Sequence, residues 1–300
     1  MLVNQQLGEY QVRRCIGFGG MGVVYEAEHV MLGRKVALKL LRQEYARSSY
    51  SRSLLKEART TSSIQHRGIV DVFGFGQHPD FGSYLVMEYL EGRPLHDLIA
   101  TSAPLAPALV IQLLIEVLDA LWAAHSHGVI HRDLKPSNIF LVRELDGSES
   151  VKVLDFGLAK RSTAPDGMAS SPEIVVGTPH YMAPEQALNE DVGPQTDLYA
   201  VGVIAFEMLT RRRPFSGRSN LEIVAHHLKS PPPRPSSYVD LPAQLDAFVL
   251  RLLAKDPQQR PASARQAAAE LRWLLQEAGF SKWVGSQLPA HVCARPATAA

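Results

Sequence analysis

The chain has 300 residues, of which 46% are hydrophobic and 20% are charged. These proportions are typical of a folded globular protein of one or two domains, and they exclude a disordered or fibrous chain. The 31 lysine and arginine residues nearly balance the 30 aspartate and glutamate residues, so the formal net charge is +1. Because wholesale binding of nucleic acid needs an extended basic surface, the charge argues against a nucleic-acid partner.

The cysteines and the apolar stretches indicate the compartment. Cys15 and Cys293 are isolated in the sequence and indicate neither a zinc site nor a disulfide framework, so we expect a reducing, cytoplasmic setting. The most apolar long stretch, residues 109–124, is interrupted by polar residues and predicts a buried helix rather than a membrane span. The first eight residues lack the pattern of a secretory signal.

The first 90 residues have a pattern typical of β-strands, with runs of β-branched and aromatic residues between glycine-containing turns. We predict five antiparallel strands. Between the third and the fourth strand, apolar residues at helical spacing predict one helix over residues 53–64. The predicted strands cover Tyr10–Arg13, Val23–Glu28, Lys35–Leu40, Ile69–Phe75 and Tyr84–Tyr89.

Helical periodicity dominates from Pro94 onward, and Glu91, Gly92 and Pro94 indicate a hinge at the change of pattern. The sequence thus predicts an α+β chain with a small β-rich lobe over residues 10–90 and a larger helical lobe over 91–279. A segment over 1–9 precedes them, and a short Ala- and Pro-rich tail over 280–300 is predicted to be disordered. The predicted helices cover Ala108–His127, Gln195–Leu209, Leu221–Leu228, Ala243–Leu253 and Ala262–Glu277.

Gly17, Gly19 and Gly22 form a GxGxxG pattern, which alone indicates little more than a flexible hairpin tip. A dinucleotide-binding turn requires a helix after the glycines, whereas Val23–Glu28 is a predicted strand, and a Walker A loop requires lysine directly after the last glycine. A glycine-rich hairpin remains, whose backbone can approach a polyphosphate while Val24 covers an apolar base.

Lys39 lies on the third predicted strand, directly after Val36, Ala37 and Leu38. An ammonium group in apolar surroundings is costly to desolvate and needs an anion. Glu57, on the predicted helix, can supply one anion and a nucleotide phosphate another. The competing interpretation is an exposed lysine on an edge strand.

Three further motifs follow in order. HRDLKPSN spans residues 131–138, DFG spans 155–157 and APE spans 183–185. A single three-letter match is weak evidence, whereas ordered matches at compatible spacing are specific. Together with the glycine-rich run and Lys39, these motifs resemble those of eukaryotic-like (Hanks-type) bacterial serine/threonine protein kinases, and the resemblance covers about residues 7–279.

This resemblance implies a two-lobed protein kinase fold: a small antiparallel sheet with one helix, and a larger, mainly helical lobe. It implies transfer of the γ-phosphoryl group of ATP, with Mg²⁺, to serine or threonine hydroxyls of protein substrates and of the chain's own activation loop. Asp133 would orient the hydroxyl and accept its proton, and Lys135 would neutralise the transferring group. Asn138 and Asp155 would bind Mg²⁺, which prefers oxygen ligands.

The resemblance also implies which residues surround the nucleotide. Lys39, paired with Glu57, would contact the phosphates, together with Asn138. Met87 would stand at the back of the adenine pocket, and the backbone of Glu88 and Leu90 would face the base. The remaining residues expected at the nucleotide are Ile16, Gly17, Phe18, Gly19, Gly20, Met21, Gly22, Val23, Val24 and Ala37.

The segment between Asp155 and Glu185 resembles an activation loop. Arg132 would bind a phosphate on that loop, or make structural contacts alone. Glu185 and Arg260 resemble an ion pair of the family, and Asp197 would anchor the backbone of the catalytic loop. The candidate phosphorylation sites are Ser162, Thr163, Ser170, Ser171 and Thr178.

Two alternative functions share part of this pattern. A pseudokinase scaffold would bind partners without catalysis, but nothing in the sequence supports a loss of catalysis, because the expected residues are present: Lys39, Glu57, Asp133, Asn138 and Asp155. A small-molecule phosphotransferase of related fold would share the glycine and HxD features, but the APE motif favours a protein acceptor. The resemblance also suggests a homodimer formed through the small lobe. Paired histidines at 125 and 127 and at 226 and 227 lack the partners of a metal site.

Overall fold

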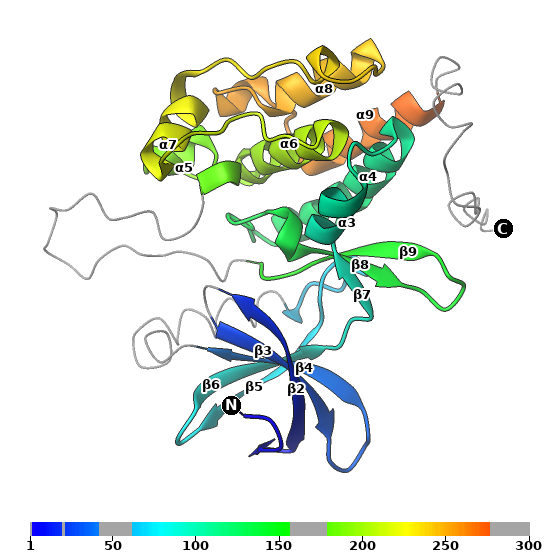
Figure 1. Ribbon diagram of the computed structural model, residues 1–300, viewed down its shortest axis with the longest axis vertical. Coiled ribbons are helices and arrows are strands. Elements are labelled where there is room, and N and C mark those ends of the chain that lie inside the picture. The colour runs from blue at the N-terminus through cyan, green and yellow to red at the C-terminus, as the bar shows by residue number, and fades with distance from the viewer. Residues whose placement is uncertain (1, 20–21, 42–61, 157–178, 277–300) are drawn as a thin grey trace, which may run out of the picture.

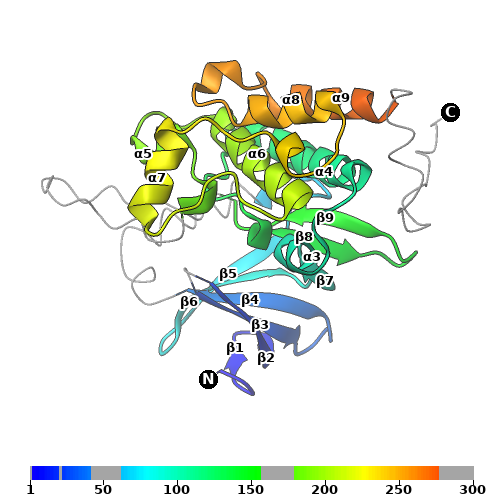
Figure 2. The same cartoon turned by 45° about the horizontal axis from the view of Figure 1, so that its top comes forward.

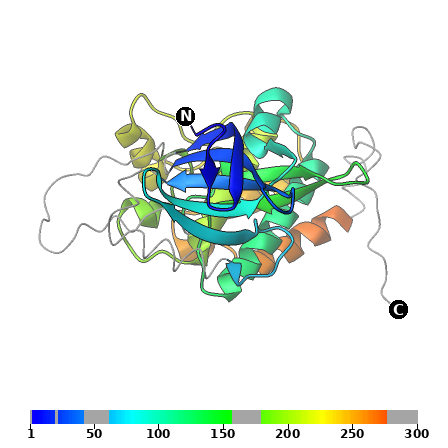
Figure 3. The same cartoon turned by 90° about the horizontal axis from the view of Figure 1, so that it is seen from below.

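The structure is a computed structural model that describes residues 2–19, 22–41, 62–156 and 179–276. Figure 1 shows two lobes, with the strands of the first 90 residues gathered at one end and the helices at the other. Seen from the small-lobe end, the strands lie over the helical lobe (Figure 3). The two-lobed α+β architecture predicted from the sequence is therefore confirmed.

The small lobe is built on a six-stranded sheet in the order β1-β2-β3-β4-β6-β5, with every neighbouring pair antiparallel. The five predicted strands are present, and a two-residue strand joins them at one edge. The fourth predicted strand begins later than expected, at Val72, because Ile69 forms an isolated parallel bridge with Val153 of the large lobe instead of entering the sheet. The strands are β1 (Gln6–Leu7), β2 (Tyr10–Gly19), β3 (Gly22–His29), β4 (Lys35–Leu41), β5 (Val72–His78) and β6 (Gly82–Glu88).

The two faces of this sheet bury different sets of side chains, as the alternation of residues along a strand requires. On β4, Leu38 belongs to a cluster that includes Leu7 and Val12, whereas the neighbouring Ala37 belongs to a second cluster with Met87. Leu2 and Leu7 are 4% and 0% exposed, so residues before position 10 pack into the small lobe. The division at residue 10 stays a prediction.

The large lobe is organised around α4 (Pro107–Ser126) and α6 (Pro194–Thr210). Every residue of α6 from Thr196 to Thr210 is buried, so this helix is surrounded by the lobe on all sides. Figure 2 shows α8 and α9 outermost, on the side of the lobe away from the small sheet. The remaining helices are α3 (Leu95–Ser102), α5 (Pro184–Ala187), α7 (Asn220–Lys229), α8 (Ala243–Leu252) and α9 (Ala264–Gln276).

Helix α4 is the one described helix that is long and apolar enough to cross a membrane. By length and composition alone it passes that test in spite of the polar residues within 109–124, over which the sequence predicts a buried helix. The helix nevertheless supplies ten buried residues to the core of the large lobe. Its apolar composition is therefore explained by burial against other helices.

A three-stranded sheet lies between the lobes, formed by β7 (Gly92–Pro94), β8 (Ile139–Arg143) and β9 (Glu149–Val153). Strand β8 directly follows the HRDLKPSN motif and β9 ends just before the DFG motif, whereas β7 falls in the predicted hinge. Gly92 allows this pairing, because a Cβ atom there would lie 1.9 Å from the carbonyl oxygen of Leu141 and the residue has φ +156°.

Several predictions concern residues outside the described ranges. These are the residues predicted to be helical from 53 to 61, the activation segment from 157 to 178 with its hydroxyl residues, and the tail. Gly20, Met21 and Glu57 also lie outside the described residues. The predicted helices at 108–127, 195–209, 221–228, 243–253 and 262–277 are confirmed within a few residues at each end, whereas α3 and α5 are additional.

Candidate active site

The catalytic loop, residues 131–138, connects α4 to β8 and is anchored on a single buried carboxylate. Asp197, in the first turn of α6, is 1% exposed. Its two oxygens accept hydrogen bonds from the backbone N–H groups of His131 and Arg132, both at 2.9 Å. His125 Nε2 lies 2.8 Å from the same carboxylate, so this histidine belongs to the anchor rather than to a metal site. The predicted role of Asp197 is confirmed.

His131 connects the catalytic loop to the strand that precedes Asp155. Its ring is fully buried and accepts a hydrogen bond from the N–H of Asp133 at Nδ1, at 3.3 Å. That assignment leaves Nε2 as the donor to the carbonyl oxygen of Leu154, at 2.8 Å. The ring also packs on Phe156, with 4.9 Å between ring centroids. The backbone at Asp133 and the backbone next to Asp155 are thus fixed by the same side chain.

Asp133 and Lys135 form an ion pair of 2.7 Å between Oδ2 and Nζ. Their side chains are 44% and 38% exposed, in contrast to the buried residues that hold the loop. Asn138 donates from Nδ2 to the carbonyl oxygen of Asp133 at 2.8 Å. The carboxylate, the ammonium and the amide expected to act on a phosphoryl group therefore lie together, with the first two open to solvent.

Lys39 is 4% exposed and lies on β4, an interior strand of the sheet, which rules out the surface-lysine interpretation. Its Nζ contacts Oδ1 of Asp155 at 2.6 Å. Burial opposes ionisation of Asp155, but the Lys39 ammonium outweighs it and lowers the pKa of the carboxyl below its usual value. The structure thus pairs Lys39 with Asp155, and the other expected partner, Glu57, lies outside the described residues.

Asn138 and Asp155 are brought side by side by pairing of the strands next to them. Ile139 of β8 pairs with Val153 of β9, and the N–H of Leu154 donates to the carbonyl oxygen of Asn138 at 2.8 Å. Because the Asn138 amide donates from Nδ2, its oxygen is left as an acceptor, and Asp155 has a second carboxylate oxygen beyond the one on Lys39. Two hard oxygen donors suit Mg²⁺, which takes few protein ligands and completes its shell with phosphate and water.

The described residues hold no group of three or more His, Cys, Asp and Glu side chains arranged for a metal ion. A metal bound by protein side chains alone is therefore not indicated in that part of the chain. A metal that needs phosphate oxygens as further ligands fits the pair at Asn138 and Asp155.

An apolar surface next to these polar groups is formed by one face of the small sheet. Val24, Ala37, Met87, Leu90 and Leu154 belong to one cluster. The first four are among the residues expected around an adenine base, so the structure brings that part of the prediction together. Such a surface, beside a lysine and the oxygen acceptors of Asn138 and Asp155, suits a nucleotide with its base in the apolar part.

The hairpin of β2 and β3 lies over this surface, with Gly17 paired to Val24 and Gly19 to Gly22. At Gly22 a Cβ atom would lie 1.9 Å from the carbonyl oxygen of Leu40, so only glycine fits there. The side chain of Val23 packs on the opposite face of the sheet, with the cluster of Leu38. Of the residues expected at the nucleotide, Val23 can therefore offer its backbone alone. Ile16 and Phe18 are exposed, at 39% and 86%.

Glu88 makes contacts that the sequence did not predict. Its Oε1 accepts from Lys152 Nζ at 2.5 Å and from the N–H of Asp71 at 2.8 Å. Its own N–H donates to the carbonyl oxygen of Asp71 at 3.0 Å, so this N–H is occupied within the protein. Glu88 thus ties the segment between the lobes to β9, and its carbonyl is the group it can present to a base.

The predicted pair of Glu185 and Arg260 is confirmed as a buried, bidentate contact, with distances of 2.8 and 2.9 Å. Thr196 adds a hydrogen bond to the same carboxylate, at 2.8 Å. Gln186, which the sequence did not single out, donates to the carbonyl oxygen of Arg132 at 2.8 Å. The end of the activation segment is thereby connected to the catalytic loop.

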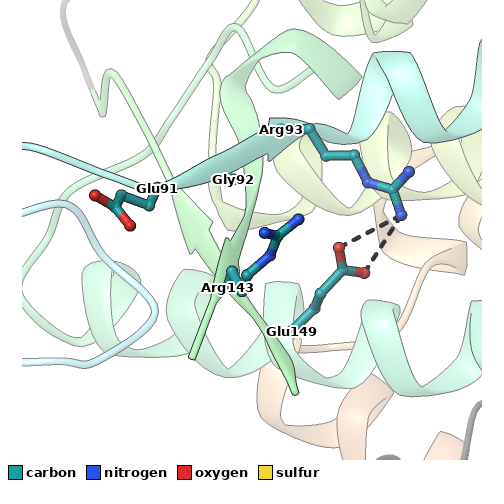
Figure 4. A pocket seen from close by; sticks show the side chains of 5 residues that line it. All are labelled: Glu91, Gly92, Arg93, Arg143 and Glu149. Carbon is teal, nitrogen blue, oxygen red and sulfur yellow. Dashed lines mark hydrogen bonds and ion pairs between the residues drawn. The ribbon is translucent and has the colours of Figure 1, made fainter. Parts of the chain in front are cut away.

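A surface pocket of about 450 Å³ lies away from these groups, along β7 and its neighbours (Figure 4). Arg93 contacts Glu149 across it, Arg143 lies between Glu91 and Glu149, and the Glu91 carboxylate points away from the other three side chains. Two basic and two acidic side chains balance in charge, and none of them belongs to the catalytic loop. The pocket is therefore separate from the candidate active site.

Comparison with known proteins agrees with this geometry. The sequence model of the protein kinase domain family matches residues 10–274 of the chain. The chain is similar to the serine/threonine-protein kinase Pkn1 of Myxococcus xanthus, with 45% identity over 269 residues, which are 87% of this chain and 38% of that protein. It is 36% identical over 277 residues to the serine/threonine-protein kinase PknB of Mycolicibacterium smegmatis, which covers 90% of this chain and 44% of the relative.

Among solved structures, the kinase domain of Mycobacterium tuberculosis PknI superposes with a TM-score of 0.70 and 26% sequence identity, covering 90% of this chain and 98% of that one. The chain thus corresponds to nearly the whole of a solved domain, but to less than half the length of the curated relatives given above.

Proposed function

The chain belongs to the protein kinase domain family, and from this premise we propose that it transfers the γ-phosphoryl group of ATP to serine and threonine hydroxyls of proteins. The supporting observation is the joint placement of Asp133, Lys135, Asn138, Lys39 and Asp155 beside one apolar surface. Its own activation segment is among the proposed acceptors.

In this proposal Asp133 orients the acceptor hydroxyl and takes its proton. An ordinary carboxylate is a weak base, which suits a loose transition state in which the proton leaves late. Positioning therefore matters more than basicity, and the hydrogen bonds at the Asp133 N–H and carbonyl oxygen supply it. Lys135, at 2.7 Å from Asp133, neutralises charge on the transferring group.

Lys39 holds the phosphates of the nucleotide, and Asn138 and Asp155 hold Mg²⁺, which neutralises phosphate charge when bound. The pairing with Lys39 keeps the Asp155 carboxylate ionised although burial opposes its charge. The adenine base lies against Ala37 and Met87, with the backbone of Glu88 and Leu90 at its edge.

The acceptors are proposed to be proteins rather than small molecules because the chain carries the intact APE segment with its buried ion pair. The resemblance of its DLKPSN loop to the serine/threonine branch supports those hydroxyls as acceptors. A cytoplasmic setting, where ATP is available, belongs to the same proposal. The homodimer through the small lobe stays a prediction.

The test is transfer of labelled phosphate from ATP to a generic protein acceptor in the presence of Mg²⁺, followed by phosphoamino-acid analysis. We expect label on serine and threonine, and a loss of about a hundredfold or more in Asp133→Asn. That variant should keep the wild-type melting temperature and its affinity for ADP, because Asp133 is 44% exposed and lies in the catalytic loop.

Two results would contradict the proposal. ADP binding without any transfer by the wild-type protein would indicate a pseudokinase scaffold. Transfer to small hydroxyl compounds alone would indicate a small-molecule phosphotransferase.

A further inference from the structure

Three polar side chains meet beside the segment that joins the lobes. The hydroxyl of Tyr89, the residue directly after β6, donates to Glu26 Oε2 at 3.1 Å and accepts from Arg14 Nη2 at 3.1 Å. Arg14 Nη2 also lies 2.6 Å from Glu26 Oε2. Each member thus contacts both of the others, and we call this group the Tyr89 cluster. The proposed roles of the active-site residues do not involve it.

Glu26 places the cluster at the edge of the expected adenine pocket. Glu26 is directly opposite Ala37 in the ladder between β3 and β4, and Val24 is two residues earlier on the same strand. Because side chains alternate along a strand, Glu26 and Val24 share a face, which is the face of the apolar cluster. A carboxylate on this face is unexpected, since its neighbours in that cluster are apolar.

The carboxylate of Glu26 depends on its partners. Its side chain is 12% exposed, and a buried charge is tolerated only when hydrogen bonds and an opposite charge compensate it. Arg14 has a 62% exposed side chain, and an ion pair with so exposed a partner is weak. The Tyr89 hydroxyl is therefore a substantial part of what holds Glu26 in place.

Arg14 and Glu26 contact Tyr89 from a part of the glycine-rich hairpin where the backbone pairing of β2 with β3 is irregular. The ladder between β2 and β3 shifts register between Val12 and Arg14, and again between Cys15 and Gly17. Arg14 lies between these two irregularities, opposite Glu26. Irregularities of this kind interrupt the ladder locally and let a strand bend. A side-chain contact at this position therefore limits the angle of the hairpin.

Tyr89, in contrast, belongs to a segment that other contacts hold in place. Tyr89 follows Glu88, whose side chain is bound to Lys152 of β9 and whose N–H is bound to Asp71. Lys35 of β4 adds a contact to the tyrosine ring, with its ammonium 5.5 Å from the ring centroid. The hydroxyl of Tyr89 thus connects the movable hairpin to a segment that is itself held by the large lobe.

We propose that Tyr89 is a positioning residue for the nucleotide: through Glu26 and Arg14, its hydroxyl fixes the distance between the glycine-rich hairpin and the segment that faces the base. This inference rests on the proposed kinase function. The hydroxyl is already engaged by Glu26 and Arg14, so it acts on nucleotide affinity without touching the nucleotide. Loss of the hydroxyl lets the hairpin lift, which weakens binding while leaving Asp133 and Lys135 in place.

The test compares Tyr89→Phe with the wild-type protein. We expect the KM for ATP and the dissociation constant for ADP, measured by calorimetry, to rise about fivefold, because one hydrogen bond to a carboxylate is lost. The value of kcat should stay within about twofold, since the catalytic loop is unaffected. The control is Tyr10→Phe, which removes a hydroxyl from β2 outside the cluster and should leave both constants unchanged.

A double-mutant cycle with Glu26→Gln separates positioning from a general effect on stability. If the cluster acts as a unit, the double variant will bind ADP about as well as the weaker single variant. Additive effects, an unchanged ADP affinity in Tyr89→Phe, or an equal effect in Tyr10→Phe would overturn the inference. A wild-type protein that binds no ADP would instead overturn the proposed function, and the inference with it.

Discussion

The buried pair of Glu185 and Arg260 offers a direct test of what holds the large lobe together. Arg260 donates from both terminal nitrogens to Glu185, and its remaining bonds go to the carbonyl oxygens of Ala254, Lys255 and Gln195. The two side chains are 0% and 3% exposed. We therefore change each partner alone, to Glu185→Gln and Arg260→Met, and both together.

The expected costs differ because the two changes leave different groups uncompensated. Breaking a buried pair by removing one partner costs about 3 to 5 kcal/mol. Glu185→Gln leaves a guanidinium that three carbonyl oxygens still bind, so we expect a value near about 3 kcal/mol. Arg260→Met leaves a buried carboxylate and three unbound carbonyls, so we expect about 5 kcal/mol.

The assay is urea unfolding at pH 7 followed by tryptophan fluorescence, which reports on the large lobe because Trp122 and Trp273 lie in it. The double variant should cost clearly less than the sum of the single variants, because it leaves no unpaired charge. The matched control is Arg272→Met, which breaks an exposed pair with Asp119 whose side chains are 46% and 37% exposed. Its cost should stay below about 1 kcal/mol. Equal costs for Arg260→Met and Arg272→Met would refute the reasoning from burial.

Two further predictions concern the catalytic loop and the response to pH. Asp197→Asn replaces one acceptor oxygen, which faces a backbone N–H, by a donor. We therefore expect a loss of about 2 to 4 kcal/mol in the free energy of unfolding and at least a tenfold lower kcat. An unchanged kcat would contradict the anchoring role. Burial, together with Arg260, lowers the pKa of Lys255 to about 8, below its usual 10.5. The unfolded chain therefore binds more protons between these values, so stability should rise with pH from about 8 to 9.5, and Lys255→Met should remove that rise in urea titrations.

The elements that the sequence predicts well are those whose pattern is local. Strands and helices follow from alternation and from helical spacing, and these periodicities appear within a single segment. Helix α3 is not predicted, although Leu95, Leu98 and Ile99 recur at helical spacing after Pro94 and all three are buried. Eight residues give too short a window for the period to stand out. Strand β7 has three residues and depends on pairing with β8, which no local pattern shows.

In the candidate active site, too, the sequence predicts which residues are present but not which of them contact each other. Ordered motifs indicate which side chains matter, and the structure brings Asp133, Lys135, Asn138, Lys39 and Asp155 together. The motifs do not indicate which of these side chains contact each other, because those contacts depend on distances set by the whole fold. Lys39 and its observed partner are 116 positions apart.

The Tyr89 cluster was not predicted from the sequence, for a related reason. Residues 14, 26 and 89 belong to no common motif, and the alternation along a strand gives the face on which Glu26 lies but not the partners of its carboxylate. The signal that could have found it is Glu26 itself, a charged residue two positions after Val24, on a predicted pocket-lining strand. A charged side chain at such a position needs a polar partner, and in the structure Glu26 has two, Tyr89 and Arg14.

The arrangement of charges separates the residues that hold the site from those proposed to act on the substrate. Asp197, Glu185 and Arg260 are buried, and each makes several hydrogen bonds that hold its side chain in place. Asp133 and Lys135 are half exposed and pair with each other, at a cost of separation of about 1 kcal/mol or less. In the proposed reaction, a phosphoryl group and a hydroxyl can therefore replace that pairing easily, while the buried anchors keep both side chains in position during the exchange.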